Sequence, residues 1–146
     1  MNLLPGIEIT ASALNAERIR MDVIAENIAN AQTTRSVDGQ PYQRKIVAFE
    51  AVLNNQNDNG LALGPESKNI LKKVEVADVR NDPTPGPLIY NPAHPHANNQ
   101  GMVQMSNVQV SREMVDLISA SRAYEANLNV ISTSRQMARQ VLSIGK

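Results

Sequence analysis

A heptad repeat at the C-terminal end of the chain constrains the fold more than any other sequence feature. Alternating steps of four and three residues connect the members of this stripe, which are Val110, Met114, Leu117, Ser121, Tyr124, Leu128, Ile131, Arg135, Ala138 and Leu142. Such a repeat is typical of a helix in a coiled coil. If Ser106 or Asn107 caps the helix and Gly145 ends it, the helix covers about residues 107 to 143. It is then roughly 55 Å long, which is too long for a small globule.

Both ends of the chain predict a helix with two apolar stripes. The C-terminal helix has a second stripe, formed by Val115, Ile118, Arg122, Ala126, Val130, Thr133, Met137 and Val141. The N-terminal helix, predicted between residues 7 and 31, has a main stripe formed by Leu4, Ile7, Ala11, Leu14, Arg18, Met21, Ala25 and Ile28. Its second stripe is formed by Ile9, Ala13, Ala16, Ile19 and Val23. One partner helix cannot cover two stripes, so we expect each helix to be enclosed from more than one side.

The middle of the chain predicts short strands and loops. Residues 42–53 and 70–79 are rich in Val and Ile and predict β-strands. Residues 88–90 and 102–105 are at most edge strands. Residues 54–60 predict a loop, because Asn, Asp and Gly dominate this stretch.

The predicted fold class is mainly α with a small β insert, in which two long terminal helices pair antiparallel as a coiled coil. Opposite charges favour this pairing, because residues 1–34 carry two basic and four acidic side chains, whereas residues 107–146 carry five and three. Five of the eight prolines lie within residues 83–95, so this tract cannot be helical. We therefore divide the chain into an N-terminal helical region (1–34), a β-rich and proline-rich middle region (35–106) and a C-terminal helical region (107–146).

The composition argues against several functions. Fourteen basic and fourteen acidic side chains give zero net charge, so neither nucleic acid nor an anionic membrane is a favoured partner. The absence of cysteine excludes disulfides and thiolate metal sites, and an aromatic content of 3% argues against the deep pocket of an enzyme. No stretch approaches the roughly 20 apolar residues of a membrane span, and the N-terminus lacks the features of a secretory signal.

Two polar motifs are candidates for a specific role. His94 and His96 flank Pro95 and could bind a metal or act as a base, but the chain has no nucleotide-binding or nucleophile motif. We expect no catalysis, no metal and no cofactor. Asn27 and Asn30 are unusual inside a helix, because asparagine prefers caps and turns. Their carboxamides either fix the exit of the helix or bridge to neighbouring subunits.

The two ends of the chain resemble a known family. Residues 25–34, with the sequence AENIANAQTT, resemble the N-terminal signature of the bacterial flagellar rod and hook proteins. Residues 121–127, with the sequence SRAYEAN, and the later Ile131, Met137 and LSIG are similar to their C-terminal signature. The short length, the strand start YQRK at residues 42–45 and the turn NPAHP resemble the proximal rod proteins of that family.

This resemblance implies a structural subunit of the flagellar basal-body proximal rod that is not an enzyme. Such a subunit polymerises through its terminal helices into the drive shaft that transmits motor torque. The implied partners are other copies of the chain, related rod proteins and the flagellar type III export apparatus. The implied location is the periplasmic rod of the basal body, which the chain reaches without a cleaved signal peptide.

We expect the terminal helices to contain the assembly interface. The candidate residues are Ile7, Leu14, Met21, Asn27, Ile28, Asn30, Met114, Leu117, Tyr124, Asn127, Leu128, Ile131, Ala138 and Leu142. Two other functions stay open. A soluble coiled-coil adaptor or export chaperone would need a closed, self-complementary seam, and a metalloenzyme would use His94 and His96. Two apolar stripes on each helix favour a rod, because rod contacts propagate without closing.

Overall fold

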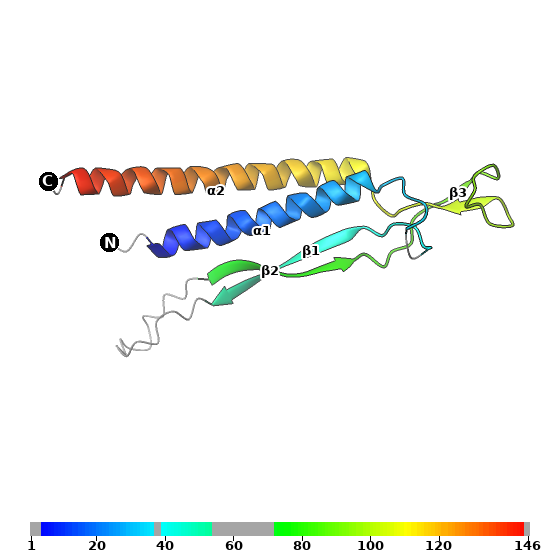
Figure 1. Cartoon of the computed structure of the whole chain (residues 1–146), viewed down its shortest axis with the longest axis horizontal. Helices are drawn as coiled ribbons and strands as arrows, with labels where there is room; N and C mark the ends of the chain where they lie inside the picture. Colours follow the sequence, from blue (N-terminus) through cyan, green and yellow to red (C-terminus); the bar gives the residue numbers. More distant parts are fainter. Residues whose placement is uncertain (1–3, 37–38, 54–71, 145–146) are drawn as a thin grey trace.

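The computed structural model describes residues 4–36, 39–53 and 72–144 of the chain. Within these residues the elements are, in chain order, α1 (Leu4–Ala29), β1 (Lys45–Leu53), β2 (Lys72–Asn81), β3 (Leu88–Tyr90), β4 (Met102–Gln104) and α2 (Val110–Ile144). Figure 1 shows an elongated molecule in which α1 and α2 lie side by side and run antiparallel. The predicted fold class, two terminal helices with a small β region between them, is confirmed at this level.

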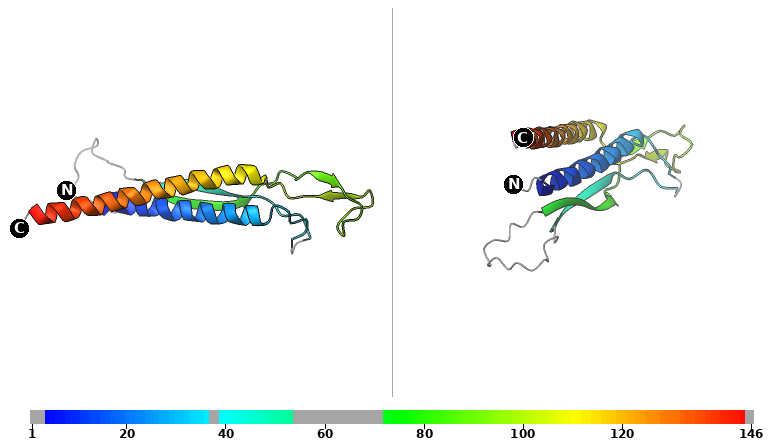
Figure 2. Two further views of the ribbon diagram at one scale, coloured as in Figure 1. Left: turned by 90° about the horizontal axis from the view of Figure 1, so that it is seen from above. Right: turned by 60° about the vertical axis from the view of Figure 1, so that its left-hand side comes forward.

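Helix α1 is the middle layer of the molecule. α2 packs on one side of it and the β1–β2 hairpin on another, while β3 and β4 lie beyond the end of the helices (Figures 1 and 2). Among the described helices and strands, α2 packs only against α1. Helix α1 is therefore covered by two partners from its own chain, whereas α2 is covered by one.

The buried side of α1 is not its predicted main stripe. The buried residues of this helix are Ala16, Val23, Ile24 and Asn27, two of which belong to the predicted second stripe. In the main stripe, Ala11, Arg18 and Ala25 are exposed, and four residues spaced one heptad apart are half-buried, namely Ile7, Leu14, Met21 and Ile28. We call these four residues the α1 ridge. The ridge borders the exposed side of α1, which is formed by Ala11, Asn15, Arg18, Asp22, Ala25 and Ala29.

In α2, half of the predicted heptad stripe faces α1. The half-buried members are Leu117, Ser121, Tyr124, Ile131 and Ala138. The other members are exposed, with 52% of Met114, 43% of Leu128 and 75% of Leu142 accessible. The second column of the contact with α1 instead consists of Glu113, Ala120, Asn127 and Ser134. The apolar pattern did not predict this rotation of the helix, because three of these four residues are polar.

The strands form two small antiparallel pairs. The register of β1 and β2 runs from Lys45 opposite Asn81 to Leu53 opposite Lys72, with one register shift near the middle. β3 and β4 pair over three residues each, so both segments that the sequence identified as edge strands do pair. The predicted loop at 54–60 lies outside the described residues.

Helix α2 begins at Val110, three residues later than predicted. Its N-cap is Gln109, whose carbonyl accepts two backbone N–H groups of the first turn, both at 3.0 Å. Ser106 Oγ instead accepts the N–H of Val108 at 3.2 Å, and the side chain of Asn107 forms its hydrogen bonds outside the helix. Both predicted caps are therefore wrong, because their side chains stabilise the segment that leads into the helix.

Gly86 lies where the chain passes directly over this leading segment. A Cβ atom at Gly86 would be 2.0 Å from the carbonyl oxygen of Met105 and 2.7 Å from the carbonyl carbon of Ser106. Only glycine fits at this distance without a movement of the backbone. The close approach holds the β3–β4 hairpin near the start of α2.

Candidate assembly surfaces and helix junction

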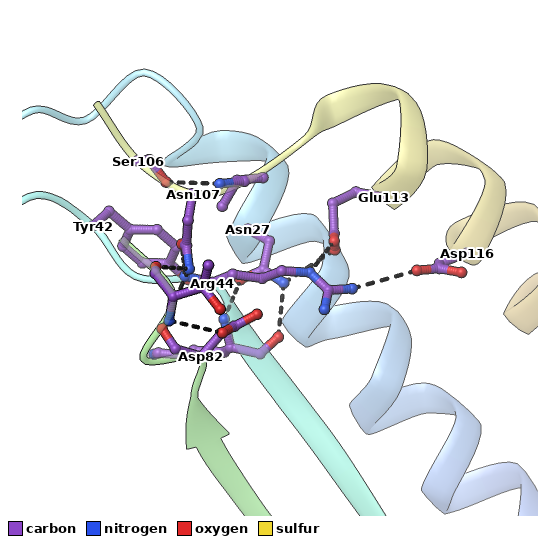
Figure 3. A network of polar contacts seen from close by, with 11 residues as sticks. Asn27, Tyr42, Arg44, Asp82, Ser106, Asn107, Glu113 and Asp116 are labelled. Carbon is purple, nitrogen blue, oxygen red and sulfur yellow. Dashed lines mark hydrogen bonds and ion pairs between the residues drawn. The ribbon is translucent and has the colours of Figure 1, made fainter. Parts of the chain in front are cut away.

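A buried polar junction connects the end of α1 to the rest of the chain (Figure 3). At its centre, Asn27 is only 1% exposed. Its Nδ2 donates to the carbonyl of Lys45 at 2.9 Å and to Oε2 of Glu113 at 3.0 Å. Its Oδ1 accepts from the N–H of Lys45 at 2.8 Å and from the hydroxyl of Tyr42 at 3.0 Å. The carboxamide thus makes four hydrogen bonds inside one chain, which fixes the exit of the helix.

Glu113, on α2, is the charged centre of the junction. It is 1% exposed, and its Oε1 accepts a hydrogen bond from Nε of Arg44 at 2.5 Å. Nη2 of the same guanidinium lies 3.4 Å from Oδ2 of Asp116. A buried carboxylate is costly unless it is paired and hydrogen-bonded, and here both oxygens of Glu113 have a donor. The Arg44–Glu113 pair therefore holds α2 to the start of β1.

Tyr42 and Lys45 complete the junction on the side of β1. Burial, together with the negative charges of Glu26 and Glu113, raises the pKa of Tyr42 to about 12. The hydroxyl therefore stays protonated at neutral pH and can donate to Asn27. Lys45 Nζ pairs with Glu26 Oε1 at 2.5 Å. Because the residues just before it serve the junction, β1 begins at Lys45 rather than at Tyr42, where the sequence predicted it.

Asn107 joins the segment before α2 to the end of the β1–β2 hairpin. Its Oδ1 accepts from the N–H of Arg44 at 2.6 Å, and its Nδ2 donates to the carbonyls of Asp82 at 3.2 Å and Thr84 at 2.8 Å. Hydrogen bonds from the side chain and backbone of Thr84 lower the pKa of the Asp82 carboxyl group. The end of α1, the start of β1 and the approach to α2 therefore meet at one place.

Asn30 has a smaller role one turn beyond Asn27. Its Nδ2 donates to the carbonyl of Glu26 at 3.0 Å, and its Oδ1 accepts from the hydroxyl of Thr33 at 3.2 Å. The side chain is half-buried. These local bonds close the last turn of α1.

The sequence identified Asn27 as unusual but gave no indication of its partners. Glu113 lies 86 positions further along the chain, and Tyr42, Arg44 and Asn107 are also distant from the helix end. No local pattern connects residues at such separations. One available signal was Glu113 itself, because a charged residue beside apolar heptad positions needs a buried partner.

His94 and His96 lie in the turn that follows β3. Their rings are 5.3 Å apart in an edge-on arrangement, and the N–H of His96 donates to Nδ1 of His94 at 3.1 Å. Nδ1 of His96 is 2.9 Å from the hydroxyl of Thr34, which connects this turn to the exit of α1. Over residues 4–36, 39–53 and 72–144, no group of three or more His, Cys, Asp and Glu side chains is placed to hold a metal. None of the helices in these ranges combines the length and apolarity needed to cross a membrane.

Large apolar side chains are exposed along the whole length of α2, on several sides of the helix, and Val141 continues the contact column of Glu113, Ala120, Asn127 and Ser134 by one heptad. We call the surface formed by these apolar side chains the α2 outer face, and its exposed residues are Met114, Val115, Ile118, Leu128, Val130, Met137, Val141 and Leu142. Extended exposed apolar surfaces of this kind mark protein contacts.

The β3–β4 hairpin is a second exposed apolar surface. Leu88, Ile89 and Tyr90 are all exposed, at the end of the molecule opposite to the two chain termini (Figure 1). Residues 83–111 contain no Asp, Glu, Lys or Arg. An uncharged surface with an aromatic residue has the composition of an interface core.

The candidate assembly residues fall into four groups. Met114, Leu128 and Leu142 are on the α2 outer face, and Ile7, Leu14, Met21 and Ile28 form the α1 ridge. Leu117, Tyr124, Asn127, Ile131 and Ala138 face α1, and Asn27 and Asn30 belong to the junction. The first group is exposed and the α1 ridge is half-buried, whereas the last two groups are engaged within the chain.

Comparison with known proteins assigns both helices to one class of protein. Residues 7–35 match a family model described as flagella basal body rod protein, and residues 99–144 match one described as flagellar basal body rod FlgEFG protein C-terminal. The chain is 42% identical to the flagellar basal-body rod protein FlgC of Borreliella burgdorferi, over 99% of this chain and 98% of that protein. It is 40% and 38% identical to the proteins of the same name from Escherichia coli and Bacillus subtilis, over the full length of both chains in each case.

These similarities extend from end to end and include both helices, the junction and the β region between them. They confirm the resemblance noted in the sequence and a role as a structural subunit of the flagellar rod rather than an enzyme. They do not favour an adaptor or export chaperone. The chain belongs to the FlgC family of flagellar basal-body rod proteins.

Proposed function

We propose that the chain polymerises in the proximal rod through the α1 ridge and the α2 outer face. The observation that carries this proposal is that α2 is covered by its own chain on one side only, while apolar side chains continue around it. Burying such side chains contributes about 1.5 to 3 kcal/mol for each large residue. Neighbouring subunits are the natural source of that cover in a rod.

Within one chain, we propose that α1 and α2 pair as a coiled coil. The half-buried residues Leu117, Tyr124, Ile131 and Ala138 recur at intervals of one heptad on the side of α2 that faces α1. A strict seven-residue repeat of this kind supports a left-handed supercoil. The pairing leaves the outward surfaces of both helices available.

The contact between subunits is heterologous in this proposal. The α1 ridge and the α2 outer face are different surfaces of one molecule, so a contact between one subunit's ridge and the next subunit's outer face propagates. Charge supports this arrangement. Between residues 127 and 144, α2 carries the exposed Arg135 and Arg139 and no acidic residue, whereas α1 carries four acidic and two basic side chains. Opposite charges at the rim of an interface favour the correct partner and register.

The exposed β3–β4 hairpin supplies a further contact, to a subunit further along the axis. Leu88, Ile89 and Tyr90 project beyond the ends of both helices, where an axial neighbour would lie. A two-stranded hairpin with three paired residues per strand is marginally stable in water, so it gains stability when a partner covers it.

The partners in this proposal are copies of the chain and related rod proteins, which together form a shaft that transmits motor torque. Export occurs through the flagellar type III apparatus, without a cleaved signal peptide, and the assembled subunit lies in the periplasmic part of the basal body. Absence of cysteine agrees with this route, because a chain threaded through a narrow channel gains nothing from cross-links.

The test is Leu128→Asp, with Asn129→Asp as the matched control. Both side chains are exposed, so neither substitution disturbs the fold of the chain, but only the first removes an apolar residue from the α2 outer face. Leu128→Asp should abolish swimming and rod formation at normal protein levels, whereas Asn129→Asp should leave both near normal. Rods of normal yield from the Leu128→Asp strain would contradict the proposal.

A further inference from the structure

We propose that the buried polar cluster of Asn27, Arg44 and Glu113 sets the register between α1 and α2. The cluster lies inside one chain, so this inference does not depend on the subunit contacts proposed above. Its function is to select one alignment of the two helices from several that their apolar residues would accept.

The apolar part of the helix contact discriminates poorly between alignments. Along α2, the apolar column that faces α1 is Leu117, Tyr124, Ile131 and Ala138, so a shift of one heptad places another apolar residue at each of the first three positions. The contact also contains small residues such as Ala16 and Ala120, both buried, which fit many neighbours. A shift of this kind moves the helix by about 10 Å.

The polar cluster discriminates strongly. In the observed register, Glu113 accepts hydrogen bonds from Arg44 at 2.5 Å and from Asn27 at 3.0 Å. A shift of one heptad would place Ala120 opposite Asn27 in place of Glu113. The carboxamide would lose an acceptor, and the Arg44 guanidinium, whose side chain is 18% exposed, would lose its closest anion. Buried charges without a partner are strongly destabilising, and one polar residue in a helix contact can fix its register.

The opposite shift offers no substitute. It would place residue 106 opposite Asn27, and residue 106 precedes the first turn of α2, which begins at Val110. The same carboxamide also binds Lys45 through both its donor and its acceptor groups. The cluster therefore aligns α2 and the β1–β2 hairpin with α1 at a single point.

Disulfide trapping can measure the register, because the chain contains no cysteine of its own. Counting eleven residues from the Asn27–Glu113 contact along each helix places Ala16 level with Tyr124. The pair A16C and Y124C therefore reports the observed register, and the pair A16C and I131C reports the register shifted by one heptad. Each pair is introduced into the full chain at low concentration, and the intramolecular disulfide is quantified by gel mobility and mass spectrometry.

Three backgrounds are compared. In the otherwise unchanged chain, the pair for the observed register should close at least about tenfold faster than the shifted pair, since specificity is the difference between competing states. In the apolar variant N27L/R44M/E113L, the two rates should come within about threefold, because apolar residues of similar volume can replace a buried ion pair without specifying its geometry. E113Q is the matched control. Its amide keeps one acceptor oxygen, but its NH2 group cannot accept the second hydrogen bond, so the preference for the observed register should be smaller than in the unchanged chain and larger than in the apolar variant.

A relocated cluster keeps the proposal testable if the apolar variant does not fold. E113A/A120E moves the carboxylate to the position that faces Asn27 after a shift of one heptad. This variant should close the shifted pair preferentially. The proposal is overturned if the apolar variant folds and retains a tenfold preference for the observed register. It is equally overturned if E113A/A120E closes the original pair preferentially or fails to form helices.

Discussion

Replacing Asn27 with alanine should destabilise the chain strongly, because the substitution removes four hydrogen bonds at once. Glu113 Oε2, the Tyr42 hydroxyl and the two backbone groups of Lys45 all lose that partner. A buried polar group left without a partner costs about 1 to 3 kcal/mol. Some of these groups keep other bonds, so we expect Asn27→Ala to lower the free energy of unfolding by about 3 to 5 kcal/mol.

Equilibrium urea unfolding of the full chain, followed by far-ultraviolet circular dichroism, measures this change. Asn30→Ala is the matched control, because Asn30 is half-buried and makes two local hydrogen bonds. Asn30→Ala should lower the free energy of unfolding by about 1 kcal/mol. Protein concentration must stay low and constant, since association would stabilise the folded state. If the free energies of unfolding of the two variants differ by less than about 1 kcal/mol, the hydrogen bonds of the junction do not hold the exit of α1.

Three further outcomes are expected. The raised pKa of Tyr42 contributes stability that is complete below pH 10 and is lost as pH rises toward about 12. The urea midpoint of unfolding of Tyr42→Phe should therefore depend less on pH between 10 and 12 than the midpoint of the unchanged chain. Changing His94 and His96 together to Asn should leave rod assembly near normal, and loss of rods with a stable protein would indicate a ligand at that turn. Hydrogen exchange on the free chain should show slow amides near Glu113, which is buried, and fast amides near Leu142, which is 75% exposed. Equal protection at both ends would contradict the lack of cover at the C-terminal end of α2.

The fold could be predicted largely from periodicity, because both helices and the strand segments are local patterns. The sequence could not give the orientation of the helices about their own axes. On α1 the more apolar stripe, with Leu14 and Met21, is only half-buried, whereas Ala16 and Val23 of the second stripe are buried. In a subunit that also contacts its neighbours, the most apolar side of a helix need not be the side that its own chain covers.

The candidate assembly residues stay a prediction, and only part of their surroundings follows from the sequence. Met114, Leu128 and Leu142 were selected as large apolar residues, and they are exposed on the α2 outer face. The junction was not predictable beyond Asn27, because its members meet only when α1, β1 and α2 are assembled. Hydrogen-bond partners separated by dozens of residues leave no periodic trace.

In a rod subunit, apolar residues must stabilise the single chain and must also form the contacts between subunits. The junction explains how one chain can do both. Among the described residues the buried apolar side chains are few, namely Ala16, Val23, Ile24, Val103 and Ala120. More large apolar residues lie on the α2 outer face than in this core, so area that could stabilise the single chain is left for contacts between subunits. The shape of the chain must then be specified by something other than apolar area. Directional hydrogen bonds and one buried ion pair can do this, because they tolerate only one geometry. Asn27 and Glu113 are therefore placed where three segments meet, and the surfaces that face other subunits remain apolar.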